Sequence, residues 1–76
     1  MRYKVGDKVK VREWGNMVEQ YGTDEDGDID CDLCFLTDMK RYCGKEMTIS
    51  KVDFLHYKME EDHGKFIWSD DMLCEP

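Results

Sequence analysis

The segment "TDEDGDIDCDLCF", residues 23–35, contains most of the side chains that could carry chemistry in this 76-residue chain. It has five aspartates, one glutamate and the cysteines Cys31 and Cys34. Carboxylate oxygens are the usual ligands of Ca²⁺, and a C-x-x-C pair lets two thiolates reach one zinc ion. The segment is therefore a calcium loop, half of a zinc site or a solvated acidic loop.

The calcium interpretation can be tested by aligning Gly27 with the glycine at position six of an EF-hand loop. Positions three, five, seven and nine then hold four aspartates: Asp24, Asp26, Asp28 and Asp30. Position one holds Gly22 instead of aspartate, and position twelve holds Leu33 instead of the bidentate glutamate. Because both end ligands are missing, the sequence supports at most a weak calcium loop.

The zinc interpretation rests on Cys31 and Cys34, which supply two of the four ligands of a structural site. The other candidates are scattered along the chain, without a second paired motif: Cys43, His56, His63 and Cys74. The surrounding aspartates raise a thiol pKa, which disfavours a thioredoxin-type redox pair. We expect no cofactor and free thiols, with zinc on Cys31 and Cys34 as the alternative.

Catalytic motifs are missing from the rest of the sequence. His56 and His63 are the only histidines, and the sequence places no serine or cysteine nucleophile beside either. No glycine-rich loop of the kind that binds phosphate is present. We expect a protein that is not an enzyme.

Charge is distributed in blocks. The net charge is -7, residues 1–12 sum to +4, residues 13–38 to -9, residues 39–58 to +3 and residues 59–76 to -5. Negative charge repels phosphate, so direct nucleic-acid binding is disfavoured and a basic protein surface is the expected partner. The sequence shows neither a long apolar run nor an export signal, so we expect a cytoplasmic protein without membrane contact.

Periodicity predicts a mainly β domain spanning residues 1–76. Side chains alternate around Val9 and Val11, and again in "KEMTISKV", "FLHYKMEED" and "KFIWS". Thr37 is the expected N-cap of a short helix that ends near Gly44, and Ser69 that of a final turn. Residues 13–34 show no period and predict a long acidic loop. The predicted core contains Val9, Val11, Ile49, Met59 and Trp68.

Four stretches carry a family resemblance: "KVGDKVKVRE", "FLTDM", "YCGKEMTISKV" and "YKMEEDHGKFIWSDDML". They resemble small proteins of prophages and mobile elements in Gram-positive gut bacteria, whose domain is similar to the SH3-like repeat named after Mind bomb. The resemblance covers residues 4–12 and 35–73 and implies a small SH3-like barrel of about five strands. Its motifs are structural, and the acidic segment departs from them.

Three aromatic residues complete the candidate binding site: Trp14, Tyr21 and Tyr42. In an SH3-like barrel, Trp14 and Tyr21 would lie in the long first loop that borders the usual ligand groove, and Tyr42 could join them. Alternatively, Trp14 folds back as a lid on the core. We expect a monomeric binding module that engages a basic partner through these aromatics and Asp24, Asp26, Asp28 and Asp30. In a sharper version, it inhibits a nucleic-acid-binding protein by mimicking phosphate charge.

Overall fold

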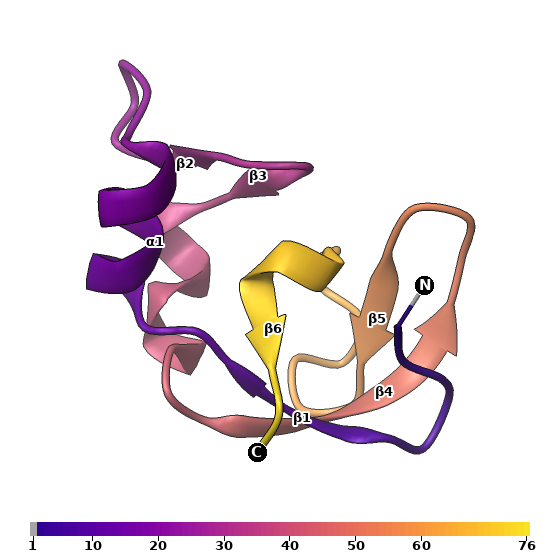
Figure 1. The fold of residues 1–76 in the computed structure, drawn as a ribbon. Helices are drawn as coiled ribbons and strands as arrows, with labels where there is room; N and C mark the ends of the chain where they lie inside the picture. The colour runs from indigo at the N-terminus through magenta and orange to yellow at the C-terminus, as the bar shows by residue number, and fades with distance from the viewer. Residues whose placement is uncertain (1) are drawn as a thin grey trace.

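The computed structural model describes residues 2–76, and these form a small, mainly β domain (Figure 1). The main sheet is antiparallel, with the order β5-β4-β1-β6. Its strands are β1 (Lys8–Val11), β4 (Glu46–Val52), β5 (Tyr57–Met59) and β6 (Leu73–Cys74). The prediction of a mainly β domain is confirmed.

The second layer contains the acidic segment, residues 23–35. It consists of helix α1 (Trp14–Tyr21) and a two-stranded sheet of β2 (Ile29–Asp30) and β3 (Cys34–Phe35). The 3-10 helix η1 (Thr37–Tyr42) connects this layer to β4, and a second 3-10 helix, η2 (Asp70–Met72), directly precedes β6. As Figure 1 shows, the β2–β3 ribbon and α1 lie together on one side of the molecule.

The prediction of an irregular loop over residues 13–34 is wrong for residues 14–21, which form α1, and for Ile29, Asp30 and Cys34, which lie in β2 and β3. Trp14, Met17 and Val18 are spaced at helical intervals, so they lie on the helix face that packs against the core. Met17 is fully buried there. Gly15 and Asn16 are poor helix formers, so the short pattern was hidden in the sequence.

The alternation predicted for the main strands is confirmed. Val9 and Val11 are fully buried, whereas Lys8 and Lys10 between them are exposed. Val9 lies opposite Met47 in β4, and Ile49 lies opposite Met59 in β5. All five side chains of the predicted core are inaccessible to solvent: Val9, Val11, Ile49, Met59 and Trp68.

The strands do not close into a barrel, which corrects that part of the prediction. "KFIWS" was expected to be a strand, but it makes a single bridge between Trp68 and Tyr57. The amide of Phe66 donates to the Asp62 carboxylate at 3.2 Å instead of to a neighbouring strand. Because this segment stops pairing after one bridge, the sheet remains open between β5 and β6.

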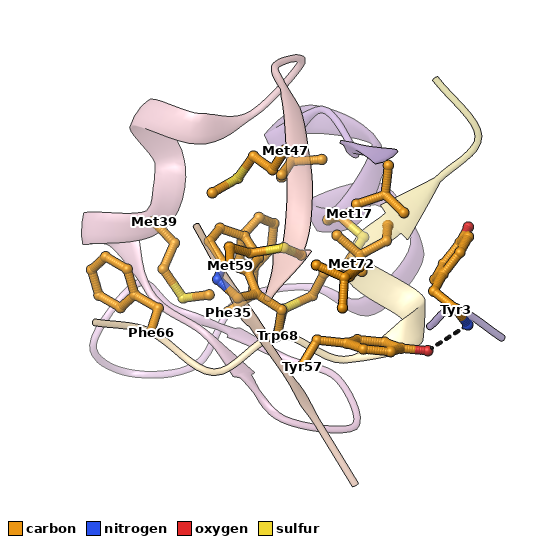
Figure 2. Close-up of a cluster of buried hydrophobic side chains, with 14 of the residues drawn as sticks. Tyr3, Met17, Phe35, Met39, Met47, Tyr57, Met59, Phe66, Trp68 and Met72 are labelled. Carbon is orange, nitrogen blue, oxygen red and sulfur yellow. Dashed lines mark hydrogen bonds between the residues drawn. The ribbon is translucent and has the colours of Figure 1, made fainter. Parts of the chain in front are cut away.

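Aromatic rings and methionines fill the core (Figure 2). Trp68 is in edge contact with Phe35 and Phe66, with centroid distances of 6.2 and 6.3 Å. Five methionines are buried around the rings: Met17, Met39, Met47, Met59 and Met72. Flexible methionine side chains fill the irregular space between two small sheets and three short helices.

The two predicted helical turns are present, and the cap residue differs from the prediction at η1 alone. Leu36 rather than Thr37 precedes η1, and Ser69 precedes η2 without a side-chain bond to the helix backbone. Met72 and Leu73, which follow Ser69, are buried in the core. Among residues 2–76, no helix has the length and apolar character needed to cross a membrane.

Candidate functional site

The tip of the acidic segment, residues 23–35, folds around the side chain of Asp24. One Asp24 carboxylate oxygen accepts the backbone N–H groups of Asp26 at 2.9 Å and Asp28 at 3.0 Å. The backbone of Asp24 also bonds to Asp28 and Gly27, and Gly27 has the positive φ of 84° that the turn requires. Asp24 is therefore a structural residue of the turn.

Two further bonds hold the acidic segment against the rest of the domain. Asp28 accepts the backbone N–H of Thr37, at the start of η1, at 2.7 Å. On the other side of the β2–β3 ribbon, Asp71 accepts the backbone N–H of Asp32 at 2.9 Å. Ile29 and Phe35 are fully buried beneath the ribbon. The β2–β3 ribbon is thus held at its open end, at its turn and on its inner face.

The other carboxylates of the segment point to solvent. Over residues 2–76, no hydrogen bond to the side chain of Asp26 or Asp30 is present, and both residues are exposed. The Lys51–Asp53 ion pair and the contact between the His56 ring and Asp53 both lie in the β4–β5 hairpin. The negative charge of the acidic segment is therefore not neutralised by any ion pair in the described part of the chain.

The two cysteines of the segment lie in different surroundings. The Cys31 thiol donates to the Leu33 carbonyl at 2.8 Å, and burial, followed by the nearby Asp71 carboxylate, raises its pKa to about 11. Cys34 is exposed and lies opposite Asp30 in the ribbon. Desolvation and then the carboxylates of Asp28, Asp24, Asp30 and Asp26 raise the Cys34 pKa. Raised thiol pKa values oppose a nucleophilic or redox role.

The ligand atoms needed for a zinc site on Cys31 and Cys34 do not come together. Within residues 2–76, one group of three metal-ligand side chains has its donor atoms within 4.8 Å: Asp24, Asp28 and Cys34. Cys31 is outside this group, so the predicted cysteine pair does not fit tetrahedral zinc. Leu33, at the predicted terminal calcium position, is half-buried against the core. The exposed group of three does not by itself make a metal site.

The three candidate aromatics do not form one exposed groove. Trp14 packs on Phe35 with a centroid distance of 5.1 Å, which is the lid arrangement that the sequence left open. Tyr42 lies edge-on to Trp68 at 5.9 Å and is half-buried. Tyr21 is exposed at the end of α1 and accepts a bond from Gln20 at 3.3 Å. Of the three, Tyr21 is the one available to a partner beside the acidic segment.

The histidines have no partner suited to catalysis among residues 2–76. His56 pairs with Asp53 at 3.2 Å, at the edge of the β4–β5 hairpin. His63 is exposed in the turn after β5 and has a positive φ of 55°. No serine, threonine or cysteine bonds to either ring in the described part of the chain, so neither histidine is placed to activate a nucleophile there.

Sequence reasoning missed the residues that anchor the acidic segment. Asp71 binds Asp32 and Ser69, and the Arg12 guanidinium reaches the Asp71 carbonyl at 3.0 Å and Gln20 at 2.7 Å. Asp71 lies in η2, whereas Arg12 directly follows β1 and Gln20 lies in α1, so the contact joins segments about 60 residues apart. No local spacing signals such a contact, because it depends on the tertiary arrangement.

Thiol chemistry gives the first testable prediction. At pH 8, iodoacetamide should alkylate Cys34 before Cys31, because Cys31 is half-buried and has the pKa of about 11. The double variant Asp26→Asn, Asp30→Asn removes two charges near Cys34, and we expect its alkylation rate to rise about two- to threefold. Peptide mapping by mass spectrometry measures both rates. Equal rates at the two cysteines would contradict the arrangement.

Comparison with known proteins adds no relative. No protein-family model, no curated protein and no solved structure matches this chain. The functional argument therefore rests on the geometry and charge of the acidic segment.

Proposed function

We propose that this chain is a non-catalytic binding module that engages a basic protein surface through its acidic segment. The supporting observation is the combination of fixed shape and free charge. Asp24 and Asp28 are used to hold the backbone, whereas Asp26 and Asp30 project into solvent without a cationic partner in residues 2–76. A preformed charged surface loses little conformational entropy when it binds.

The partner chemistry follows from the sign and spread of the charge. Exposed carboxylates speed the encounter with a basic surface, and their effect weakens as salt rises. Tyr21, exposed beside the segment, adds an amphipathic ring of the type common in interfaces. In the sharper form of the proposal, the partner is a nucleic-acid-binding protein whose phosphate-binding channel the carboxylates occupy. The module acts as a monomer in the cytoplasm of a bacterial host, as a phage or mobile-element product.

The proposal extends to the fold type. An SH3-like ancestry is supported by the four-stranded antiparallel order β5-β4-β1-β6 and by the five buried side chains expected for such a barrel. The acidic ribbon and α1 occupy the region that corresponds to the long first loop. In this proposal the chain is an open variant of the SH3-like fold whose first loop has gained its own secondary structure.

The test distinguishes the contribution of the exposed carboxylates to binding from that of the folded shape of the segment. The double variant Asp26→Asn, Asp30→Asn removes two free carboxylates and leaves the bonds of Asp24 and Asp28 in place. The matched control Glu46→Gln, Glu60→Gln changes the net charge equally at exposed positions of the main sheet and the turn after it. A basic DNA-binding protein enriched on the immobilised chain, identified and purified, serves as the probe in titrations at low and high salt.

We expect the first variant to weaken binding to that protein by roughly tenfold at low salt and the control to leave it within about twofold. Duplex DNA should compete with the chain if the carboxylates occupy a phosphate-binding channel. An equal loss in both variants would mean that only net charge matters. No loss in either variant, or binding that is insensitive to salt, would overturn the role of the acidic segment.

A further inference from the structure

The hairpin between β4 and β5 carries an apolar pair that the fold does not use. Phe54 is 89 % exposed and Leu55 is 64 % exposed. On either side of them the chain turns inward, since Val52 packs against the core and Tyr57 is fully buried. Single exposed apolar residues are common, but two adjacent large ones at a hairpin tip are candidates for a contact surface.

The tip is held in shape by bonds of its own. The backbone N–H of Asp53 donates to the His56 carbonyl at 2.9 Å, which closes the turn around Phe54 and Leu55. The Asp53 carboxylate pairs with His56 at 3.2 Å and Lys51 at 3.7 Å. Phe54 and Leu55 are therefore displayed on a closed turn, and ordering them on binding has a low entropic cost.

The charges around the tip are opposite in sign to those of the acidic segment. Lys51 is the exposed cation of the tip, beside the single carboxylate of Asp53, whereas the Lys58 ammonium donates to the Gly64 carbonyl at 3.1 Å in the turn after β5. Arg2 and Lys4, both exposed, flank Tyr3, whose amide donates to the Tyr57 hydroxyl at the base of the hairpin (Figure 1). The acidic segment lies on the other side of the molecule in this view. The tip thus differs from the acidic segment in both place and charge.

We propose that Phe54 and Leu55 insert into an apolar pocket of a partner protein whose rim carries carboxylates. Two side chains can fill a pocket but supply far less than the roughly 1,200 Å² that a stable interface between two copies buries. An anionic bilayer would repel a chain with a net charge of -7. A pocket with an acidic rim would bury the apolar side chains of Phe54 and Leu55 and place carboxylates near the Lys51 ammonium.

The pocket chemistry can be tested with synthetic hosts of known rim charge. β-Cyclodextrins have an apolar cavity and are obtained with anionic sulfobutyl, neutral hydroxypropyl or cationic ammonium rims. We expect the anionic host to bind several-fold more tightly than the cationic one and to shift the NMR signals of Phe54 and Leu55. The net charge of the chain favours the opposite order, so a tighter cationic host, or shifts located elsewhere, would overturn the proposal.

The partner is tested by cross-linking within the organism that encodes the chain, with benzoylphenylalanine at position 54. The cross-linked protein, purified, should bind the double variant Phe54→Ser, Leu55→Ser at least tenfold more weakly than the native chain. Ile67→Ser, at a 40 % exposed position, is the control and should bind normally. Conversion of the partner's rim carboxylates to amides should weaken binding. A cross-link to a second copy, to lipid or to nothing overturns the proposal.

The proposal for the hairpin tip and the proposal for the acidic segment can be contradicted independently of each other. The tip variant should retain the native melting temperature, because both side chains are exposed in the folded state. It should also retain salt-sensitive binding through Asp26 and Asp30, if that activity is present.

Discussion

Replacing Asp62 with alanine is expected to lower the free energy of unfolding by about 3–5 kcal/mol. The Asp62 side chain is buried, with 5 % of its surface exposed. Its carboxylate accepts three bonds: from the Gly64 amide at 3.0 Å, the Phe66 amide at 3.2 Å and the Trp68 indole N–H at 3.0 Å. Alanine would leave the Phe66 amide and the Trp68 indole N–H, both buried, without an acceptor, whereas the Gly64 amide would keep its bond to the Met59 carbonyl at 3.2 Å.

This loss is large for a domain of this size, since such domains have a total stability of about 5–15 kcal/mol. Urea denaturation, followed by tryptophan fluorescence and by circular dichroism, measures the change. Asp38→Ala is the matched control, because Asp38 is exposed in η1 and the same charge is removed. We expect this control to stay within about 0.5 kcal/mol of the native chain.

Asp62→Asn provides an intermediate case. Its side-chain oxygen can still accept a hydrogen bond, whereas its NH₂ group would stand opposite one of the N–H donors that the carboxylate accepts. We expect it to lie between the native chain and Asp62→Ala. If Asp62→Ala were as stable as Asp38→Ala, the carboxylate would not be holding the turn and the indole. The description of "KFIWS" as a segment anchored by Asp62 would then be wrong.

The same carboxylate explains why the fold was only partly predictable. Alternation is a local property, so the sequence predicted β4 and the burial of Ile49, Met59 and Trp68. It also predicted a strand at "KFIWS", whose side chains alternate as expected. Whether that segment pairs depends on where its amides donate. The Phe66 amide donates to the Asp62 carboxylate instead of to a strand carbonyl, and the alternating pattern of side chains does not show which acceptor is used.

The acidic segment was predictable in composition and not in shape. Its charge density correctly indicated exposure at Asp26 and Asp30. The inward use of Asp24 and Asp28, and the separation of Cys31 from Cys34, depend on the path of the β2–β3 ribbon. C-x-x-C spacing allows two thiolates to converge, but here Cys31 bonds within the turn while Cys34 lies opposite Asp30.

Alkaline pH should destabilise the domain through Tyr57. Its ring is fully buried, its hydroxyl donates to the Asp70 carboxylate, and the same oxygen accepts the Tyr3 backbone N–H at 3.0 Å. Burial, and then the bond to Asp70, raises the pKa of Tyr57 to about 12. The folded state therefore keeps this phenol protonated at a pH where the unfolded chain, with a pKa near 10, has lost the proton.

The contribution of Tyr57 is complete below pH 10 and is lost as the pH rises towards 12. A pKa of about 12 in the folded state, against about 10 in the unfolded chain, corresponds to about 3 kcal/mol. The free energy of unfolding measured in urea should therefore be lower at pH 12 than at pH 8 by an amount of that order. Tyr57→Phe should be less stable at pH 8, because the Asp70 carboxylate and the Tyr3 amide lose their partner, yet its decline above pH 10 should be shallower.

Cys31 supplies an internal comparison, because its pKa of about 11 places its own loss of stability at lower pH, from about 9 to 11. Cys31→Ala should remove that earlier part of the decline and leave the part due to Tyr57. Each variant thus flattens a different range of pH. If Tyr57→Phe showed the same decline between pH 10 and 12 as the native chain, the buried phenol would not be the group whose ionisation opens the fold.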